Sequence, residues 1–374
     1  MPIADTGEPN IMYLNRFRRA SRTLWVRLPA TLLVIFLFSS CQQFGYYMHA
    51  TGGQLALLWD RESIESLLAR PDLEPVLADK LRLVKAARQF AQDELDLPVN
   101  DAYATYVALP RRHVVWNLQA AGEFSTDSHE WCFPVAGCVA YKGYFEEMLA
   151  RRNADQMSAA GFDVYVRGVN AYSTLGWFDD PVLSSFIHYA DHSLVALLFH
   201  ELAHRKLYVS GDTSFNESWA TAVQIIATER WATDGRSALT TDQVLRQLQA
   251  TARVSAFVDE TLHTLAGIYS QEALSPVEKR LLKQDILDDL HSQYLALEAD
   301  FGYPMGYGHF FSQPLNNAAL LSVGHYTMWV PAFLQKYRQL DADLAQFYSW
   351  STALASLAKS ERDAVLQVLQ AAAS

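Results

Sequence analysis

Two histidines one helical turn apart, with a glutamate directly after the first, are the residues of this chain best suited to chemistry. They are His200, Glu201 and His204. Residues four apart lie on one face of an α-helix, so both imidazoles can bind a single ion about 2.0–2.1 Å from each nitrogen. Glu201 could then hold a water molecule on that ion and take its proton as the water attacks a carbonyl. The spacing predicts a hydrolytic zinc site with one ion.

The helix that carries these residues is expected to be buried, because residues 193–199 before them are almost entirely apolar. Uncompensated polar groups are costly in such surroundings, and a bound cation would explain why they are tolerated. The alternative is a helix whose histidines bond to backbone carbonyls and whose glutamate pairs with a neighbouring base.

A catalytic zinc site usually has three protein ligands and one open position, so a third ligand is required. Leu207 and Ser210 occupy the places of the glycine and the third histidine in the extended motif, which excludes that motif. Glu217 is the better candidate, because it opens a second apolar helix. The turn at residues 209–213 can bring that helix back beside the first.

Glu217 also has a structural interpretation. The segment from Ser214 to Glu217 has the pattern of a capping box, in which the glutamate side chain bonds back to the serine N–H. Glu229, later on the same predicted helix, is the fallback ligand. The sequence leaves these alternatives open.

Composition limits the classes of function. The chain has 374 residues, 50% hydrophobic and 12% aromatic, which supports one large or two modest folded domains. Its net charge of −11 becomes about −14 without residues 1–40, which carry five arginines, Asp5 and Glu8. A surface of that sign argues against binding nucleic acid or anionic lipid as the main function.

The amino terminus has the features of an export signal. Basic residues precede the apolar run at 31–38, which is too short for a confident membrane span of about 20 residues. Ser39 and Ser40 lead into Cys41, as in the lipobox of bacterial lipoproteins. We therefore predict a signal peptide at residues 1–40 and a lipid anchor at Cys41, with an uncleaved signal anchor as the alternative.

If Cys41 is lipidated, Cys132 and Cys138 remain as an even pair, which predicts a small disulfide in an oxidising compartment. Two buried thiols are the alternative. The loop between the two cysteines contains proline and glycine and could close tightly.

The remaining pattern is mainly helical, with β-rich segments ahead of the zinc helix. We expect an α+β, mostly α fold, with residues 41–374 in a single domain. Predicted helices cover residues 74–95, begin near residues 241 and 276, and end with one at 341–359; predicted strands lie within 103–109, 113–118, 132–141 and 162–172.

Together with the zinc helix and Asn216-Glu217, three further segments carry a resemblance. They are residues 131–138, 141–145 and 171–181. The chain resembles the predicted aminopeptidase family of proteobacterial lipoproteins. The resemblance implies a zincin-like, gluzincin-type metallopeptidase with a small sheet packed on the zinc-binding helix. It also implies ligands at His200, His204 and Glu217, a general base at Glu201, a peptide substrate, and a lipid-anchored position on the periplasmic side of a bacterial membrane.

Other parts of a peptidase site can be assigned by role. Val164–Tyr172 is the candidate edge strand for an added peptide strand. Tyr326 is the first candidate to stabilise the oxyanion, followed by Tyr172 and His325. Four acids could bind a substrate ammonium group: Glu146, Glu147, Asp179 and Asp180.

Three functions remain open at this point. The first is a zinc aminopeptidase. The second is a zinc endopeptidase or amidase that acts on envelope proteins or wall peptides. The third is a lipoprotein that binds metal without turnover, which Glu201 disfavours because a structural zinc site needs no base and normally fills all four positions.

Overall fold

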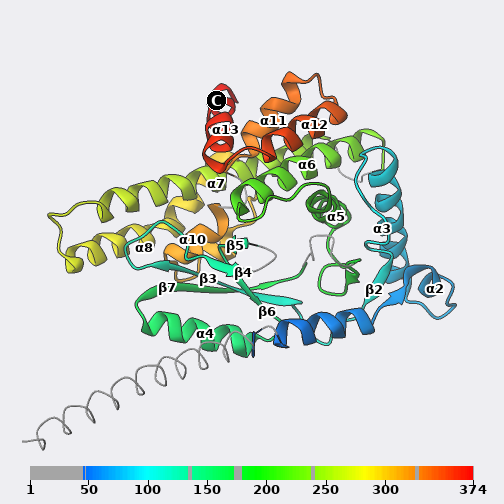
Figure 1. Ribbon diagram of the computed structural model, residues 1–374, viewed down its shortest axis with the longest axis horizontal. Helices are drawn as coiled ribbons and strands as arrows, with labels where there is room; N and C mark the ends of the chain where they lie inside the picture. Colours follow the sequence, from blue (N-terminus) through cyan, green and yellow to red (C-terminus); the bar gives the residue numbers. More distant parts are fainter. Residues whose placement is uncertain are drawn as a thin grey trace, which may run out of the picture. The chain divides into compact units, whose positions relative to one another are not determined.

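The computed structural model describes residues 45–46, 48–133, 137–171, 179–236, 241–324 and 328–373. Its contacts divide the chain into two units, Met1–Ala56 and Leu57–Ser374. The described residues of the first unit are helical. The second unit holds the candidate site and is mostly helical, with three small sheets among its described residues (Figure 1). The observed class is the predicted one, α+β and mostly α.

The helices of the second unit differ widely in length. They are α2 (Ile64–Leu68), α3 (Pro75–Asp93), α4 (Glu147–Ala159), α5 (Asp191–Lys206), α6 (Thr213–Thr233), α7 (Thr241–Tyr269), α8 (Pro276–Phe301), α9 (Gly308–Phe311), α10 (Asn317–Gly324), α11 (Val330–Gln339), α12 (Leu344–Ala355) and α13 (Lys359–Ala373). No described helix is long and apolar enough to cross a membrane.

The strands are short except for two. They are β1 (Glu62–Ser63), β2 (Thr105–Val107), β3 (Val115–Gly122), β4 (Trp131–Phe133), β5 (Gly137–Val139), β6 (Lys142–Tyr144), β7 (Phe162–Val169) and β8 (Val182–Leu183). Sheet orders are β1-β2-β8, β6-β3-β7 and the hairpin β4-β5. The β2–β8 pair is parallel, whereas the other described pairs are antiparallel.

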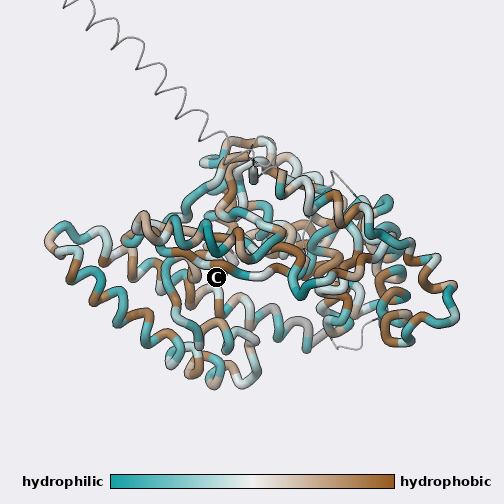
Figure 2. The backbone as a smooth tube through the Cα atoms, turned by 90° about the horizontal axis from the view of Figure 1, so that it is seen from below, coloured by the Kyte–Doolittle hydropathy of each residue, from teal (hydrophilic) through white to brown (hydrophobic). Residues whose placement is uncertain are grey.

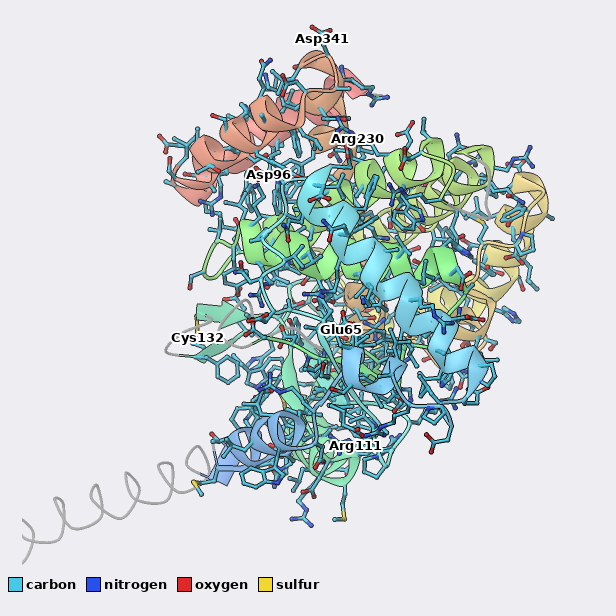
Figure 3. All side chains as sticks on the ribbon, turned by 90° about the vertical axis from the view of Figure 1, so that its right-hand side faces the viewer. Glu65, Asp96, Arg111, Cys132, Arg230 and Asp341 are labelled. Atoms are coloured by element: carbon cyan, nitrogen blue, oxygen red, sulfur yellow. A yellow bond between two sulfur atoms is a disulfide. The ribbon has the colours of Figure 1, made fainter. Side chains whose placement is uncertain are left out.

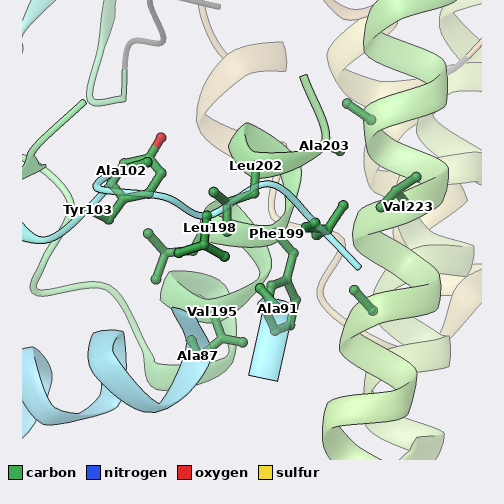
Figure 4. Packing of buried hydrophobic residues seen from close by; sticks show 14 of the residues in the cluster. Ala87, Ala91, Ala102, Tyr103, Val195, Leu198, Phe199, Leu202, Ala203 and Val223 are labelled. Carbon is green, nitrogen blue, oxygen red and sulfur yellow. The ribbon is translucent and has the colours of Figure 1, made fainter. Parts of the chain in front are cut away.

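Helix α5 lies between α3 and α6, and Figure 1 shows it end-on in that position. Its buried apolar side chains lie on one broad side of the helix, whereas Ala196 and Leu197 are only partly buried, so the helix is less fully enclosed than the sequence predicts. Figure 4 shows Val195, Leu198, Phe199 and Leu202 of α5 packed with residues of α3 and α6. Strands β2 and β8 add side chains to the same core, while β3 and β7 pack against α4 and α10. Where the sequence predicted one small sheet, the described strands form three.

Helices α7 and α8 enclose a second hydrophobic cluster with α10. The tube of Figure 2 alternates between hydrophobic and hydrophilic residues along such peripheral helices, as expected of helices with one buried face. Helix α8 begins at the predicted position with a capping box, in which the Ser275 and Glu278 side chains are each bonded to the other's backbone. Lys283 ties α8 to β7 through a 2.6 Å ion pair with Asp163.

A buried ion pair links the last helix to the start of α6. The Arg362 guanidinium on α13 lies 2.7 Å from the Asp212 carboxylate, and the two side chains are 6% and 2% exposed. Asp212 is the N-cap of α6 and accepts a bond from the Phe215 N–H. The sequence prediction of one closing helix at 341–359 is wrong, since α12 ends at Ala355 and a separate α13 carries Arg362.

Candidate metal centre

Helices α5 and α6 bring three potential ligand atoms together. The Nε2 atoms of His200 and His204 lie 3.2 Å apart. Oε2 of Glu217 lies 3.3 Å from the first and 3.5 Å from the second. All three side chains are at most 12% exposed.

This triangle matches the donor spacing of a tetrahedral metal ion. Donors about 2.0–2.1 Å from an ion, at tetrahedral angles, are separated by roughly 3.3–3.4 Å. His200, His204 and Glu217 could therefore hold a metal ion. Three protein donors also leave the fourth tetrahedral position to a small ligand such as water, as in catalytic rather than structural sites.

The charges within the cluster shift the pKa values of His204 and Glu217 in opposite directions. Burial alone would lower the pKa of His204, but the charge and hydrogen bond of Glu217 outweigh it and raise that pKa. Burial alone would raise the pKa of Glu217, but the charge of His204 and hydrogen bonds from both rings hold it well below its ordinary value. The buried Glu217 carboxylate therefore favours the protonated form of His204. A metal ion would compete with that proton for the ring nitrogen.

These shifts predict opposite pH dependences with and without metal. The raised pKa of His204 stabilises the metal-free fold below about pH 6.5, and this contribution is lost as pH rises through the raised value. The lowered pKa of Glu217 contributes above about pH 4.3, and that contribution is lost at lower pH. The Tm of chelator-treated protein should therefore fall from pH 6 towards pH 9.

With zinc present, the same pH interval should increase the stabilisation, because unprotonated imidazole is the ligand form. Calorimetry in chelator and in excess zinc measures both slopes. Glu217→Ala is the control, since it removes the partner that raises the pKa of His204. Parallel slopes in chelator and in zinc would contradict the assignment.

The start of α6 decides between the two interpretations of Glu217. The helix begins at Thr213, and its N-cap is Asp212 rather than Ser214. The capping-box interpretation is therefore wrong, and the Glu217 side chain lies against the two imidazoles instead. The fallback Glu229 is twelve residues further along α6, about 18 Å along its axis from Glu217.

Glu201 shares one face of α5 with Arg205, because the two are four residues apart. The Arg205 side chain is 7% exposed and lies 3.3 Å from the Asp179 carboxylate. Next to this face is Tyr103, whose N–H donates to the Asp180 carbonyl at 2.7 Å. Burial raises the pKa of the Tyr103 hydroxyl, and the charges of Glu201 and Asp180 act in the same direction.

Tyr103 is held in an unusual backbone conformation. Its φ is +57°, a region that costs a bulky side chain about 1–3 kcal/mol. Arg88 on α3 fixes the preceding loop by donating to the carbonyls of Ala102 and Asn100, at 2.7 and 2.9 Å. The sequence offered no signal for Tyr103, because its proximity to Glu201 arises from this distant loop.

Tyr208 is a second aromatic neighbour of the site that sequence reasoning missed. It belongs to the segment that connects the two ligand helices in the sequence, and its side chain is half-buried. Burial raises the pKa of its hydroxyl, and so does the charge of Glu217. Its position four residues after His204 was the available signal.

The other predicted site residues that are described do not lie together in one place. Tyr172, Tyr326 and His325 lie outside the described residues, as do Cys41 and the predicted signal peptide. Of the four candidate acids, Asp180 is buried beside the Glu201 face and Asp179 pairs with Arg205 there. Glu147 instead pairs with Arg151 on α4, and Glu146 is exposed at the start of that helix.

The predicted edge strand is observed as β7. Among the described strands it pairs only with β3, so its other side is an edge of the sheet. One outward carbonyl on that edge, that of Val164, accepts a 2.9 Å hydrogen bond from the Asn316 side chain. An added peptide strand would have to pair beyond that contact.

A disulfide joins Cys132 and Cys138, which face each other across the β4-β5 hairpin. Cys132 is exposed, and Figure 3 shows it at the outer edge of the molecule. The hairpin approaches the α5–α6 turn, where the first ligand helix ends and the second begins.

The fold and this cluster define a mostly α, α+β protein with a buried two-histidine, one-glutamate group able to hold a metal ion. Comparison with known families then identifies the chain more closely. It belongs to the family described as "Putative aminopeptidase", whose profile matches residues 45–366. No curated protein and no solved structure matches it. Membership supports a peptidase with a peptide substrate.

Proposed function

We propose that this protein is a zinc-dependent aminopeptidase. The observation that supports it most directly is the triangle of His200, His204 and Glu217 donor atoms, spaced for one tetrahedral ion. Glu201 follows the first ligand on the same helix. The family to which the chain belongs supplies the class of reaction.

The nitrogen and carboxylate donors suit zinc, and three of them leave a position for water or substrate. When bound, such an ion lowers the pKa of water and polarises the substrate carbonyl. The Glu201 carboxylate accepts the proton of the attacking water and passes it to the leaving amine nitrogen as the C–N bond breaks. The charge of this carboxylate acts on the hydroxyl of Tyr103, and the Asp179–Arg205 pair involves a residue of the same helix face.

We assign the substrate's ammonium group to the acidic side of this face, at Asp179 and Asp180. Asp179 pairs with Arg205 on the helix that carries Glu201, and the charges of Asp180 and Glu201 both raise the pKa of the Tyr103 hydroxyl, which supports this assignment. The test of the whole proposal is metal analysis of purified protein, followed by assay of aminoacyl and N-blocked peptides. We expect one zinc per chain and chelator-reversible cleavage of the free-amine substrates. Preference for N-blocked peptides would favour the endopeptidase alternative, and activity unaffected by removing the metal would refute zinc catalysis.

Tyr208 is proposed to donate a hydrogen bond to the oxyanion, since it follows the first ligand helix directly and the charge of Glu217 contributes to the raised pKa of its hydroxyl. A hydrogen bond to a charged group contributes about 1.5–3 kcal/mol, so Tyr208→Phe should lower kcat by roughly 10- to 150-fold with little change in KM. Tyr106→Phe, which removes a hydroxyl bonded to Ser184, is the matched control. Equal kcat values for the two variants would exclude this role.

We also propose that the mature protein is anchored by lipid at Cys41 on the periplasmic side of a bacterial membrane. The support is the sequence pattern ahead of that cysteine. Cys41→Ser should move the protein from the membrane fraction to the soluble fraction after cell lysis. Membrane association that survives this substitution, with residues 1–40 retained, would instead indicate the uncleaved anchor.

A further inference from the structure

The β4-β5 hairpin lies directly on the turn that joins the two ligand helices. A Cβ atom placed on Gly137 would come within 2.5 Å of Ser210 Oγ and 2.8 Å of the Gly211 backbone nitrogen. Such separations are shorter than real carbon contacts, so only glycine permits this approach. Gly137 is adjacent to Cys138, and the disulfide closes the hairpin at that point.

The start of the same turn, at Val209, is fixed to α6 by Asn216. Its side-chain oxygen accepts from the Val209 N–H at 2.8 Å, and its side-chain nitrogen donates to the Val209 carbonyl at 2.7 Å. Asn216 is 2% exposed and directly precedes Glu217. If the turn moved, Asn216 would move with it, and the third ligand, Glu217, would be displaced as well.

We propose that the disulfide-closed β4-β5 hairpin positions Glu217, so that the metal affinity of the site depends on the oxidised state of Cys132 and Cys138. The inference rests on the proposed metal site and adds its regulation. The oxidised hairpin supports the turn at Ser210 and Gly211, next to Val209, which is bonded to Asn216. Opening the disulfide releases one side of that support.

The redox step is a two-electron reduction of the disulfide. A dithiol reductant attacks one sulfur, the S–S bond breaks, each cysteine sulfur takes up a proton, and the reductant becomes a disulfide. Cys132 is exposed, so a reductant can reach the bond. In a reducing compartment the site binds metal weakly, and it gains affinity where disulfides persist.

The first experiment measures metal affinity in the two redox states. Co²⁺ is titrated into oxidised protein and into protein reduced with a phosphine and then thiol-blocked, with a competing chelator and visible absorption as the readout. We expect affinity to fall at least tenfold on reduction. The double variant Cys132→Ser/Cys138→Ser should have the Co²⁺ affinity of the reduced protein. Treatment with the reductant should not change that affinity. Glu217→Ala should bind weakly in both states, because the ligand to be positioned is missing.

A pair of glycines provides the matched structural control. Gly137 and Gly161 both have positive φ, +76° and +88°, but a Cβ on Gly161 meets nothing within 4 Å. Both alanine variants incur backbone strain, whereas only Gly137→Ala pushes against the turn. Gly137→Ala should therefore weaken Co²⁺ binding more than Gly161→Ala at equal thermal stability.

Amide hydrogen exchange tests the positioning without any metal. Reduction should speed exchange over residues 207–217 and leave α8 unchanged. If oxidised wild type binds no Co²⁺, the proposed function fails. The exchange comparison still tests whether the β4-β5 hairpin supports the turn. If affinity and exchange are both unchanged by reduction, the hairpin has no such role.

Discussion

Glu201→Gln is expected to lower kcat for peptide hydrolysis by about 10²–10⁴-fold, the usual contribution of a general base. Glutamine keeps the size of the side chain and its place on α5 but cannot accept the proton of the attacking water. The substitution spares all three proposed ligands, so zinc content should stay equal to that of wild type. Steady-state kinetics and metal analysis on the same preparation measure both quantities.

Glu229→Gln is the matched control for that result, because it makes the same chemical change on α6 at a distance from the cluster. It should retain wild-type kcat and zinc content. A Glu201→Gln enzyme that keeps its kcat would remove the assigned base, and the metal site would then have no identified proton acceptor among the described residues.

Glu217→Ala is expected to abolish stable zinc binding. The two histidines of α5 would remain as a two-donor group, which is one donor short of the usual catalytic set. Outer-shell partners of a metal ion are typically worth about 10- to 100-fold in affinity, and loss of a direct ligand should exceed that. Chelator competition at pH 7 measures the affinity.

Glu229→Ala again serves as the control, because it was the fallback ligand on the same helix. It should bind zinc as wild type does. The metal-free forms should also be compared by calorimetry, since Glu217→Ala removes the carboxylate that stabilises protonated His204. Full zinc affinity in Glu217→Ala would show that the third donor lies elsewhere.

The local parts of this site could be predicted from sequence because helical periodicity fixes them. His200 and His204 had to share a face of one helix, and the structure places their Nε2 atoms 3.2 Å apart. The sequence suggested Glu217 as a metal ligand but left its role open. A glutamate near the start of a helix can serve either as a ligand or as a capping residue. Asp212, two residues before Ser214, is the N-cap, and it also pairs with the buried Arg362, a contact that local sequence does not reveal.

Contacts between segments that are distant in the sequence could not be predicted from the sequence pattern. The parallel pairing of Tyr106 with Val182 and the approach of Tyr103 to Glu201 join segments far apart in the chain. No periodicity encodes such pairings. The same reason explains the three sheets, since a short strand shows its composition but not its partner. The break between α12 and α13 was missed because amphipathic spacing continues on both sides of it.

The Arg362–Asp212 pair has a consequence for biosynthesis. The closer of the two cationic partners of Asp212, the N-cap of the glutamate-bearing helix, is Arg362, which follows it by 150 residues. A nascent chain emerging in order from a ribosome or translocon cannot make this contact until residue 362 has emerged, 150 residues after Asp212. Termination before Lys359 would remove both cationic partners of the buried Asp212 carboxylate, Lys359 at 3.5 Å and Arg362 at 2.7 Å, and would leave its charge uncompensated.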